Sequence, residues 1–265
     1  MRWKILLLFA GLVLGTAANS AFAAEDAYAD VHTAAVVSAI GDYAAMKEQT
    51  DISGAFQSNS AIVDISDRDI DGAIQKQIES VVGSRFQVAK PSYNRGAFLN
   101  ANPQSATDNY DETLKALLQA QPPMQDVDAV IVVHRDYNSV DGRLDGPWLK
   151  GLGVLKVKMM FGAISSTSAY ASYAISVIDT KTGEILGDGR ATIGEGWLNQ
   201  SLPRMTVDDD EWTSAMNGLP LASKTQLEDE FQKLIFDSLP SALRGAKLIS
   251  DAGDQSTAKF NTTHP

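Results

Sequence analysis

The segment 127–134 (VDAVIVVH) constrains the fold more than any other part of this 265-residue sequence, because it is an almost unbroken apolar run. Such a run is typical of a central strand that is covered on both faces, as happens where helices pack on the two sides of a sheet. The surrounding sequence alternates strand and helix signals. The sequence therefore predicts an α/β (α+β) protein: a mixed sheet with a β-hairpin and about three helices packed on it.

Three amphipathic segments predict the helices. In the first, Ser66 and Asp69 form a Ser-x-x-Asp capping box, apolar residues follow at helical spacing, and Gly83 lies where a C-terminal glycine cap belongs. The second helix is expected over residues 108–121, because the two prolines that follow would end it. The third begins at the capping box of Thr225.

Two further strands and a hairpin complete the expected sheet. Residues 33–40 (TAAVVSAI) and 60–65 (SAIVDI) are short, apolar and bounded by polar residues. Residues 170–178 alternate in hydrophobicity and predict the first strand of the hairpin. Residues 179–183 (DTKTG) predict its turn, and residues 184–193 predict its second strand. No linker or internal repeat separates these elements, so one domain is expected.

The N-terminus has the three parts of a secretory signal. Arg2 and Lys4 supply the positive region, residues 5–14 supply a short apolar run, and a small-x-small cleavage site ends at Ala23. The apolar run is too short to cross a bilayer, which takes about 20 residues. We expect cleavage before Ala24 and a periplasmic or secreted mature protein.

The expected organisation is a signal peptide over residues 1–23, one α/β domain over 24–248, and a polar, disordered tail over 249–265. The sequence has no cysteine, which excludes disulfides and a lipid anchor on an N-terminal cysteine. The formal charge is −11, and it becomes −13 without the two cations of the signal. This acidity argues against nucleic acid and anionic lipid as partners, and no second apolar stretch predicts a transmembrane segment.

The strand at 127–134 and the hairpin at 174–186 (AISVIDTKTGEIL) together resemble a known family. Their order is similar to the N-terminal domain of the Tol-Pal protein TolB, and to related domains of the curli secretion lipoprotein and the penicillin-binding-protein activator lipoproteins. The local motif is the turn from Asp179 to Gly183. The resemblance implies a TolB-N-like fold over roughly residues 33–248 and an envelope binding or scaffolding role without catalysis.

His134 and Asp136 lie where the central strand ends, the edge of a sheet at which ligands tend to bind. Two residues apart, they lie on the same side of a strand, so they could act as a general base with its partner or as metal ligands. An ordinary strand end is the alternative. The remaining histidines, His32 and His264, lie far away in the sequence.

The densest acidic run is Asp208, Asp209 and Asp210, followed by Glu211. Oxygen-rich clusters can bind calcium. This run lacks the alternating spacing and the glycine of a calcium loop, so a solvated loop is the alternative.

No catalytic or cofactor motif is present. The sequence has no Gly-x-Ser-x-Gly, no phosphate-binding glycine loop, no dinucleotide fingerprint and no His-Glu-x-x-His. Gly151 and Gly153 are only a fragment of such patterns. We therefore expect no cofactor.

Residues 148–164 (WLKGLGVLKVKMMFGAI) are apolar and basic within an acidic protein. They could form a partner-binding loop, since methionine and aromatic side chains suit adaptable contacts. The alternative is a half-buried strand with its lysines outside. The candidate contact residues are Trp148, Leu152, Met159, Met160 and Phe161.

These observations favour a soluble exported protein that binds another envelope protein and catalyses nothing. A hydrolase that uses His134 and Asp136, with or without a metal, is the first alternative. A small-ligand carrier is the second, because the long loops at 92–107 and 199–224 could close a pocket.

Overall fold

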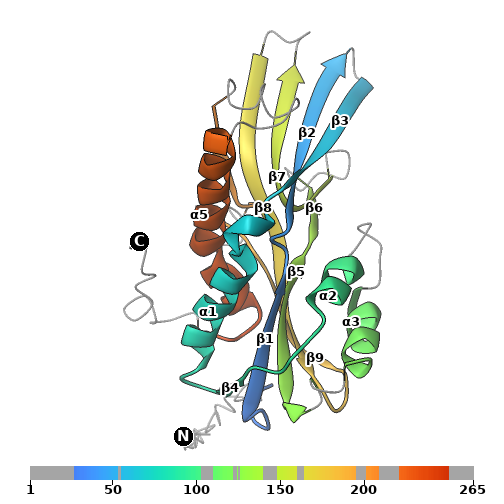
Figure 1. The fold of residues 1–265 in the computed structure, drawn as a ribbon, viewed down its shortest axis with the longest axis vertical. Coiled ribbons are helices and arrows are strands. Elements are labelled where there is room, and N and C mark those ends of the chain that lie inside the picture. The colour runs from blue at the N-terminus through green and yellow to red at the C-terminus, as the bar shows by residue number, and fades with distance from the viewer. Residues whose placement is uncertain are drawn as a thin grey trace, which may run out of the picture.

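One mixed sheet with helices on both sides forms the protein (Figure 1). The computed structural model describes residues 27–52, 55–102, 110–121, 124, 126–139, 148–159, 164–194, 201–208 and 221–250. Within these residues the chain forms ten strands and four α-helices. The α/β class predicted from the sequence is confirmed.

The strand order is β3-β2-β7-β8-β5-β1-β4, with β6 beside β7 and with β9 and β10 beside β8. The strands are β1 (Thr33–Ala39), β2 (Tyr43–Ile52), β3 (Ala55–Asp64), β4 (Gln87–Ala89), β5 (Ala129–Arg135), β6 (Tyr137–Ser139), β7 (Trp148–Met159), β8 (Ile164–Asp179), β9 (Ile185–Arg190) and β10 (Arg204–Thr206). The helices are η1 (Ser66–Arg68, a 3₁₀ turn), α1 (Ile70–Val82), α2 (Arg95–Ala101), α3 (Tyr110–Gln119) and α5 (Leu221–Gly245).

The 16-residue strand β8 joins the two halves of the sheet. Residues 164–172 pair with β7, and residues 173–179 pair with β5. Strands β7 and β5 therefore follow one another along the same edge of β8 and separate near Arg135 and Gly151. In Figure 1, β2, β3 and β7 extend beyond this point in one direction, while β1, β4 and β9 lie in the other.

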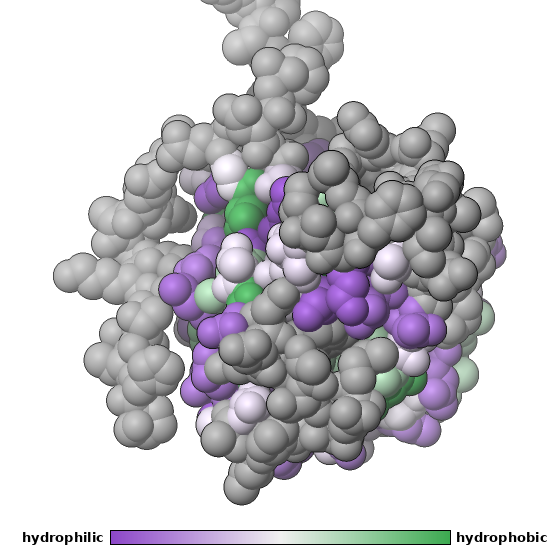
Figure 2. Space-filling model, turned by 90° about the horizontal axis from the view of Figure 1, so that it is seen from above, coloured by the Kyte–Doolittle hydropathy of each residue, from purple (hydrophilic) through white to green (hydrophobic). Residues whose placement is uncertain are grey.

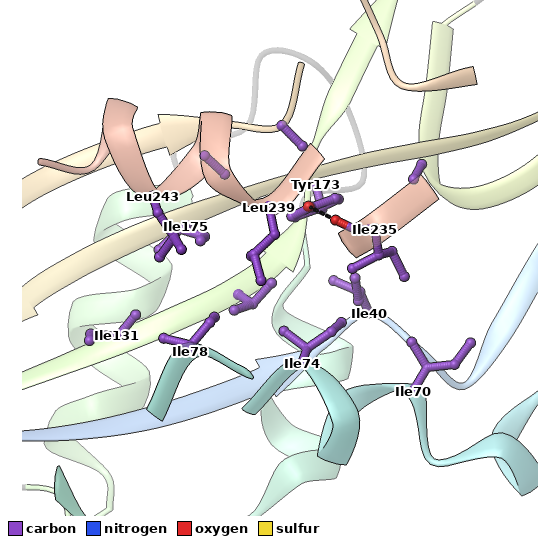
Figure 3. Packing of buried hydrophobic residues seen from close by; sticks show 14 of the residues in the cluster. Ile40, Ile70, Ile74, Ile78, Ile131, Tyr173, Ile175, Ile235, Leu239 and Leu243 are labelled. Atoms are coloured by element: carbon purple, nitrogen blue, oxygen red, sulfur yellow. Dashed lines mark hydrogen bonds between the residues drawn. The ribbon is translucent and has the colours of Figure 1, made fainter. Parts of the chain in front are cut away.

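Helices α1 and α5 cover one face of the sheet, and α2 and α3 cover the other (Figure 1). The first face carries the main core, in which apolar side chains of α1 point toward those of α5 (Figure 3). Burying each such side chain contributes about 1.5–3 kcal/mol relative to leaving it exposed. The large side chains in this core include Ile40, Ile70, Ile74, Ile78, Ile131, Ile175, Phe231, Ile235, Leu239 and Leu243.

Strand β5 is buried at all seven positions, as expected for a strand between two helical layers. Its alternate residues enter different cores. Ile131 and Val133 join the α1–α5 side, whereas Val130 and Val132 join the cluster under α2 and α3. The prediction of a central strand covered on both faces is confirmed.

Strand β2 and helix α2 were not predicted, and neither were the short strands β6 and β10. Strand β2 mixes small, charged and amide side chains, so it has no clear apolar signal, yet it pairs with β3 on one side and β7 on the other. Helix α2 lies in a stretch predicted as loop, and the Asn94 side chain caps it by accepting from Ala97 N. Its seven residues are too few for a helical repeat to show in the sequence.

The predicted cap of α1 needs a correction. Asp69, with φ of 46°, is the N-cap and accepts from Gly72 N at 3.1 Å, while Ser66 begins the preceding 3₁₀ turn. The Ser66 hydroxyl instead donates to Asp64 at 2.6 Å. An aspartate side chain tolerates the left-handed conformation needed here, because its short polar group bonds locally.

Helix α5 begins at Leu221, before the capping box predicted at Thr225, and it contains a proline. Pro240 lies inside α5, which runs on to Gly245. No helix within the described part of the chain is long and apolar enough to cross a membrane. Seen from above, the described surface mixes hydrophilic residues with small hydrophobic areas (Figure 2).

Candidate functional site

His134 is buried in the layer under α3 instead of facing solvent at the strand end. Its Nε2 lies 3.0 Å from Ser176 Oγ, its Nδ1 lies 3.2 Å from the Arg135 carbonyl oxygen, and its ring lies 4.2 Å from that of Tyr110. Burial lowers the pKa of His134 to about 4. A neutral imidazole with both nitrogens occupied is poorly placed to act as a base.

Asp136 binds a different residue. Its Oδ2 lies 3.1 Å from Arg190 Nε, and burial raises its pKa. Within the described residues no hydrogen bond joins Asp136 to His134. The structure therefore gives the two members of the expected acid/base pair separate partners.

Ser176 connects His134 to a different carboxylate, Asp188. The Ser176 hydroxyl lies 3.0 Å from Asp188 Oδ1 and equally far from His134 Nε2. In a nucleophilic triad the histidine lies between the serine and the acid. Here the serine lies between, and it is 1% exposed, so the order and the burial both differ from that chemistry.

Residues 148–159 form strand β7, which is the strand alternative for this segment. Leu152 is 1% exposed and packs in the main core, so it is not available to a partner. Met159 is 41% exposed. The Trp148 side chain, Met160 and Phe161 lie outside the described residues.

The lysines of β7 do not line a solvent face. Lys156 is buried, and Lys158 binds Glu48 of β2 at 2.7 Å. By strand alternation they share a face with Leu152 and Val154, which belong to the main core. The acid Glu48 on the neighbouring strand β2 thus accounts for one of the lysines in this basic segment.

Of the acidic run, only Asp208 is described, and Asp209 and Asp210 lie outside the described residues. No group of three or more histidine, aspartate or glutamate side chains within the described ranges could hold a metal ion.

The polar groups that do converge lie where β1 ends and the sheet divides. Asp71, in the first turn of α1, accepts from Ser38 Oγ at 2.6 Å and from the backbone N–H groups of Ile40 at 3.0 Å and Gly41 at 3.3 Å. Its Oδ2 also accepts from Arg95 Nε at 3.0 Å. Every bond that Asp71 makes there holds the end of β1 against α1 and α2.

Arg95 joins this carboxylate to a second one. Its Nη2 contacts both Asp71 Oδ2 and Asp42 Oδ1. Two acids are therefore held by one guanidinium and by backbone amides. Burial lowers the pKa of Arg135, the next cation, and the charges of Asp71 and Asp42 act in the opposite direction.

Arg135 is the last residue of β5 and the largest fully buried side chain in the described structure. Its Nε and Nη2 both donate to the Ile40 carbonyl oxygen, at 3.1 and 2.8 Å. The guanidinium carbon lies 3.4 Å from the centre of the Tyr43 ring, a cation–π contact. Its Nη1 has no hydrogen-bond partner within the described residues.

A second polar atom without a partner among the described residues is the Tyr170 hydroxyl, on β8. Tyr170 lies opposite Gly153 of β7 and packs with Leu149, Leu155 and Leu202. Burial raises the pKa of this phenol, and the charge of Arg135 acts in the opposite direction. The Arg135 and Tyr170 side chains lie at neighbouring positions of β7, Arg135 beside Gly151 and Tyr170 beside Gly153.

The sequence patterns did not predict this arrangement. Arg135 lies between the candidates His134 and Asp136 but was given no role, and Gly151 and Gly153 were interpreted only as a fragment of catalytic and cofactor motifs. The available signal was the spacing of two glycines on one apolar strand, which marks a close approach by other groups. The approaching groups themselves are far away in sequence.

Comparison with known proteins identifies no family, since no family model and no curated protein matches the chain. Among solved structures, a hypothetical protein from Chlamydia trachomatis is similar over 79% of this chain and 98% of its own, with 12% identity and a TM-score of 0.24.

Proposed function

We propose that this protein is an exported, non-catalytic binding protein of the bacterial envelope, and that the edge strand β3 binds an extended segment of a partner protein. The observation that carries the proposal is the edge itself. Among the described residues, strand β3 ends the sheet and pairs only with β2, over ten residues, and its sequence has no charged residue before Asp64.

Exposed sheet edges are normally protected. Natural proteins shorten them or place lysine, proline or bulges on them, because the unpaired N–H and C=O groups accept another strand. Strand β3 has no lysine and no proline, and it pairs with β2 without a register shift. Such an edge suits strand addition, in which main-chain hydrogen bonds supply affinity.

Ile62 gives the edge an apolar contact. Its side chain is 71% exposed, while Ala61 and Val63 on the other face pack against the main core. The strand is therefore anchored from one side and presents an apolar residue on the other. A partner strand could cover Ile62 with a side chain of its own.

The non-catalytic part of the proposal is supported by His134 and Asp136. The histidine is buried with a lowered pKa, and the carboxylate is paired with Arg190. The exported location is supported by the signal pattern before Ala24.

The test is site-specific photo-crosslinking in the native organism, with the probe at Ile62 or, as a control, at the exposed Ser84. We expect osmotic shock to release a chain that begins at Ala24, and position 62 alone to crosslink one discrete protein. The double variant Ser60→Lys with Ile62→Lys should abolish binding, whereas Ser80→Lys with Ser84→Lys adds equal charge on the α1 side and should not.

Cytoplasmic retention of the full chain would contradict the exported location. Equal crosslinking from positions 62 and 84, or equal loss in the two double-lysine variants, would contradict binding at the β3 edge.

A further inference from the structure

We propose that Arg135 Nη1 and Tyr170 Oη hold the carboxylate of a small ligand, in a site built over Gly151 and Gly153 of β7. This site is separate from the β3 edge, and the proposal does not depend on partner binding there.

The first argument is the incomplete pairing of Arg135. Its side chain is 1% exposed, and its hydrogen bonds go only to backbone carbonyl groups. No carboxylate within the described residues forms an ion pair with it. Buried charges in proteins are ordinarily paired, because an uncompensated buried ion is costly. Arg135 therefore has one amino group available for an acceptor.

The second argument is that the Tyr170 hydroxyl is unpaired in the same region. It is one of only two tyrosine hydroxyls in the described residues that are buried without a partner. A buried phenol usually finds one. Its neighbours Leu149, Leu155 and Leu202 are apolar, and such low-polarity surroundings strengthen any hydrogen bond formed there.

The glycines of β7 make room for both groups. A Cβ atom at Gly151 would lie 2.7 Å from Arg135 Cδ, and one at Gly153 would overlap the Tyr170 hydroxyl. Gly151 also has φ of 63°, which other residues rarely adopt. The two glycines lie two residues apart on one strand. Because they have no side chains, the Arg135 guanidinium group and the Tyr170 phenol can both pack closely against this part of β7.

The donor set selects the chemistry of the ligand. Arg135 Nη1 offers hydrogens only, and the Tyr170 hydroxyl offers one more. A carboxylate accepts at both oxygens and donates nothing, and hydrogen bonds to a charged partner are about twice as strong as neutral ones. A primary amide would bring its own N–H groups against these donors.

The surrounding charges favour a monoanion. Arg95 and Arg135 together balance Asp42 and Asp71, so these four groups sum to zero when all are ionised. A phosphate dianion would add two negative charges to a neutral group beside two carboxylates. A single carboxylate adds one negative charge beside Arg135, a buried cation for which the described residues supply no ion pair.

The test is an NMR titration of the purified protein with acetate, acetamide and phosphate at constant ionic strength. We expect acetate to bind with a dissociation constant in the millimolar range, as suits so small a ligand. Acetamide and phosphate should bind at least about tenfold more weakly, because an amide lacks the charge and phosphate carries too much.

Tyr170→Phe is the principal variant, because it removes an unpaired hydroxyl and should leave the melting temperature unchanged or higher. It should weaken acetate binding about fivefold or more. Arg135→Met keeps the side-chain stem and should abolish binding, although it also loses the bonds to Ile40 and is the riskier variant for folding. Ser80→Ala, on the exposed face of α1, is the control.

Equal affinity for acetate and acetamide, tighter binding of phosphate, or unaltered acetate binding in a folded Tyr170→Phe would each overturn the proposal. Absence of any acetate shift in the wild type would also overturn it, since the free donors would then be met by water or by the chain itself.

Discussion

Thr33 and Asp128 hydrogen-bond to each other in both directions. Thr33 Oγ1 donates to Asp128 Oδ2 at 2.9 Å, and the Asp128 backbone N–H donates to Thr33 Oγ1 at the same distance. The carboxylate also accepts from the backbone N–H groups of His32 and Thr33. These bonds fix the start of β1 beside the start of β5.

Thr33→Val should lower the free energy of unfolding by about 0.5–1.5 kcal/mol, because it keeps the β-branched shape and removes two hydrogen bonds, while the Asp128 carboxylate and N–H keep their backbone partners. Thr33→Ser retains the hydroxyl and should lose less than half of that. Chemical denaturation measures the difference in unfolding free energy, with one m value fitted to all three proteins. Equal losses in both variants would show that the side-chain shape, not the hydroxyl, matters.

His134 should make the protein less stable in acid. The folded pKa is about 4 and the unfolded value is near 6.5, so between these the unfolded chain binds more protons. Stability that is fully present above pH 6.5 is therefore lost as the pH falls toward 4, by up to about 3 kcal/mol. Asp136 and Asp188, whose pKa values are raised by burial, act in the opposite direction at the acidic end.

The measurement compares unfolding free energies of wild type and His134→Gln from pH 7.5 to 4. The variant should show a flatter profile, because both carboxyls remain in it and cancel from the difference. His32→Gln removes a histidine at an exposed position and serves as the control. Parallel profiles for wild type and His134→Gln would contradict the assignment.

Gly189 of β9 should not tolerate a side chain. A Cβ atom there would lie less than 3.0 Å from the backbone of Ala242 and Ala246, on or just after α5. Gly189→Ala should therefore cost about 1–3 kcal/mol by displacing the helix from the sheet. Gly96→Ala, inside α2 with its nearest contact at 3.3 Å, should be neutral or stabilising by up to about 1 kcal/mol. Thermal melts of both variants distinguish these effects.

The elements that the sequence predicts correctly are those whose signal is local. Residues 127–134 carry an apolar run that any context would bury, and Ile70, Ile74 and Ile78 mark one face of α1. Strand β2 lacks such a signal, because Glu48 meets its cation, Lys158, across 110 residues of sequence. Polar residues that are paired this way look like loop residues until the partner strand is known.

The candidate site escaped prediction for a similar reason. Arg135 and Tyr170 lie 35 positions apart in the sequence, and the change of partner along β8 brings them to two nearby glycines, Gly151 and Gly153. His134 was predicted as a general base or metal ligand because a histidine at the end of a strand often has such a role. Its position relative to α3, which buries it, depends on a helix packing that no local pattern specifies.

Asp71 should be the least replaceable carboxylate in the described structure. It is 3% exposed and accepts hydrogen bonds from Ser38, Ile40, Gly41 and Arg95. Asp71→Ala leaves buried donors unpaired and should cost about 3–5 kcal/mol. Asp71→Asn keeps the shape but places an amide donor against other donors, so a smaller loss is expected.

Asp67→Ala provides the comparison, because Asp67 lies just before the same helix. Its carboxylate is 62% exposed and binds Lys224, and an exposed pair of this kind contributes little to stability. Denaturant titration of the three variants should therefore give a large loss for Asp71→Ala, an intermediate one for Asp71→Asn, and almost none for Asp67→Ala. If Asp71→Ala and Asp67→Ala were equally stable, the end of β1 would be held by packing alone and the bonds to Asp71 would be incidental.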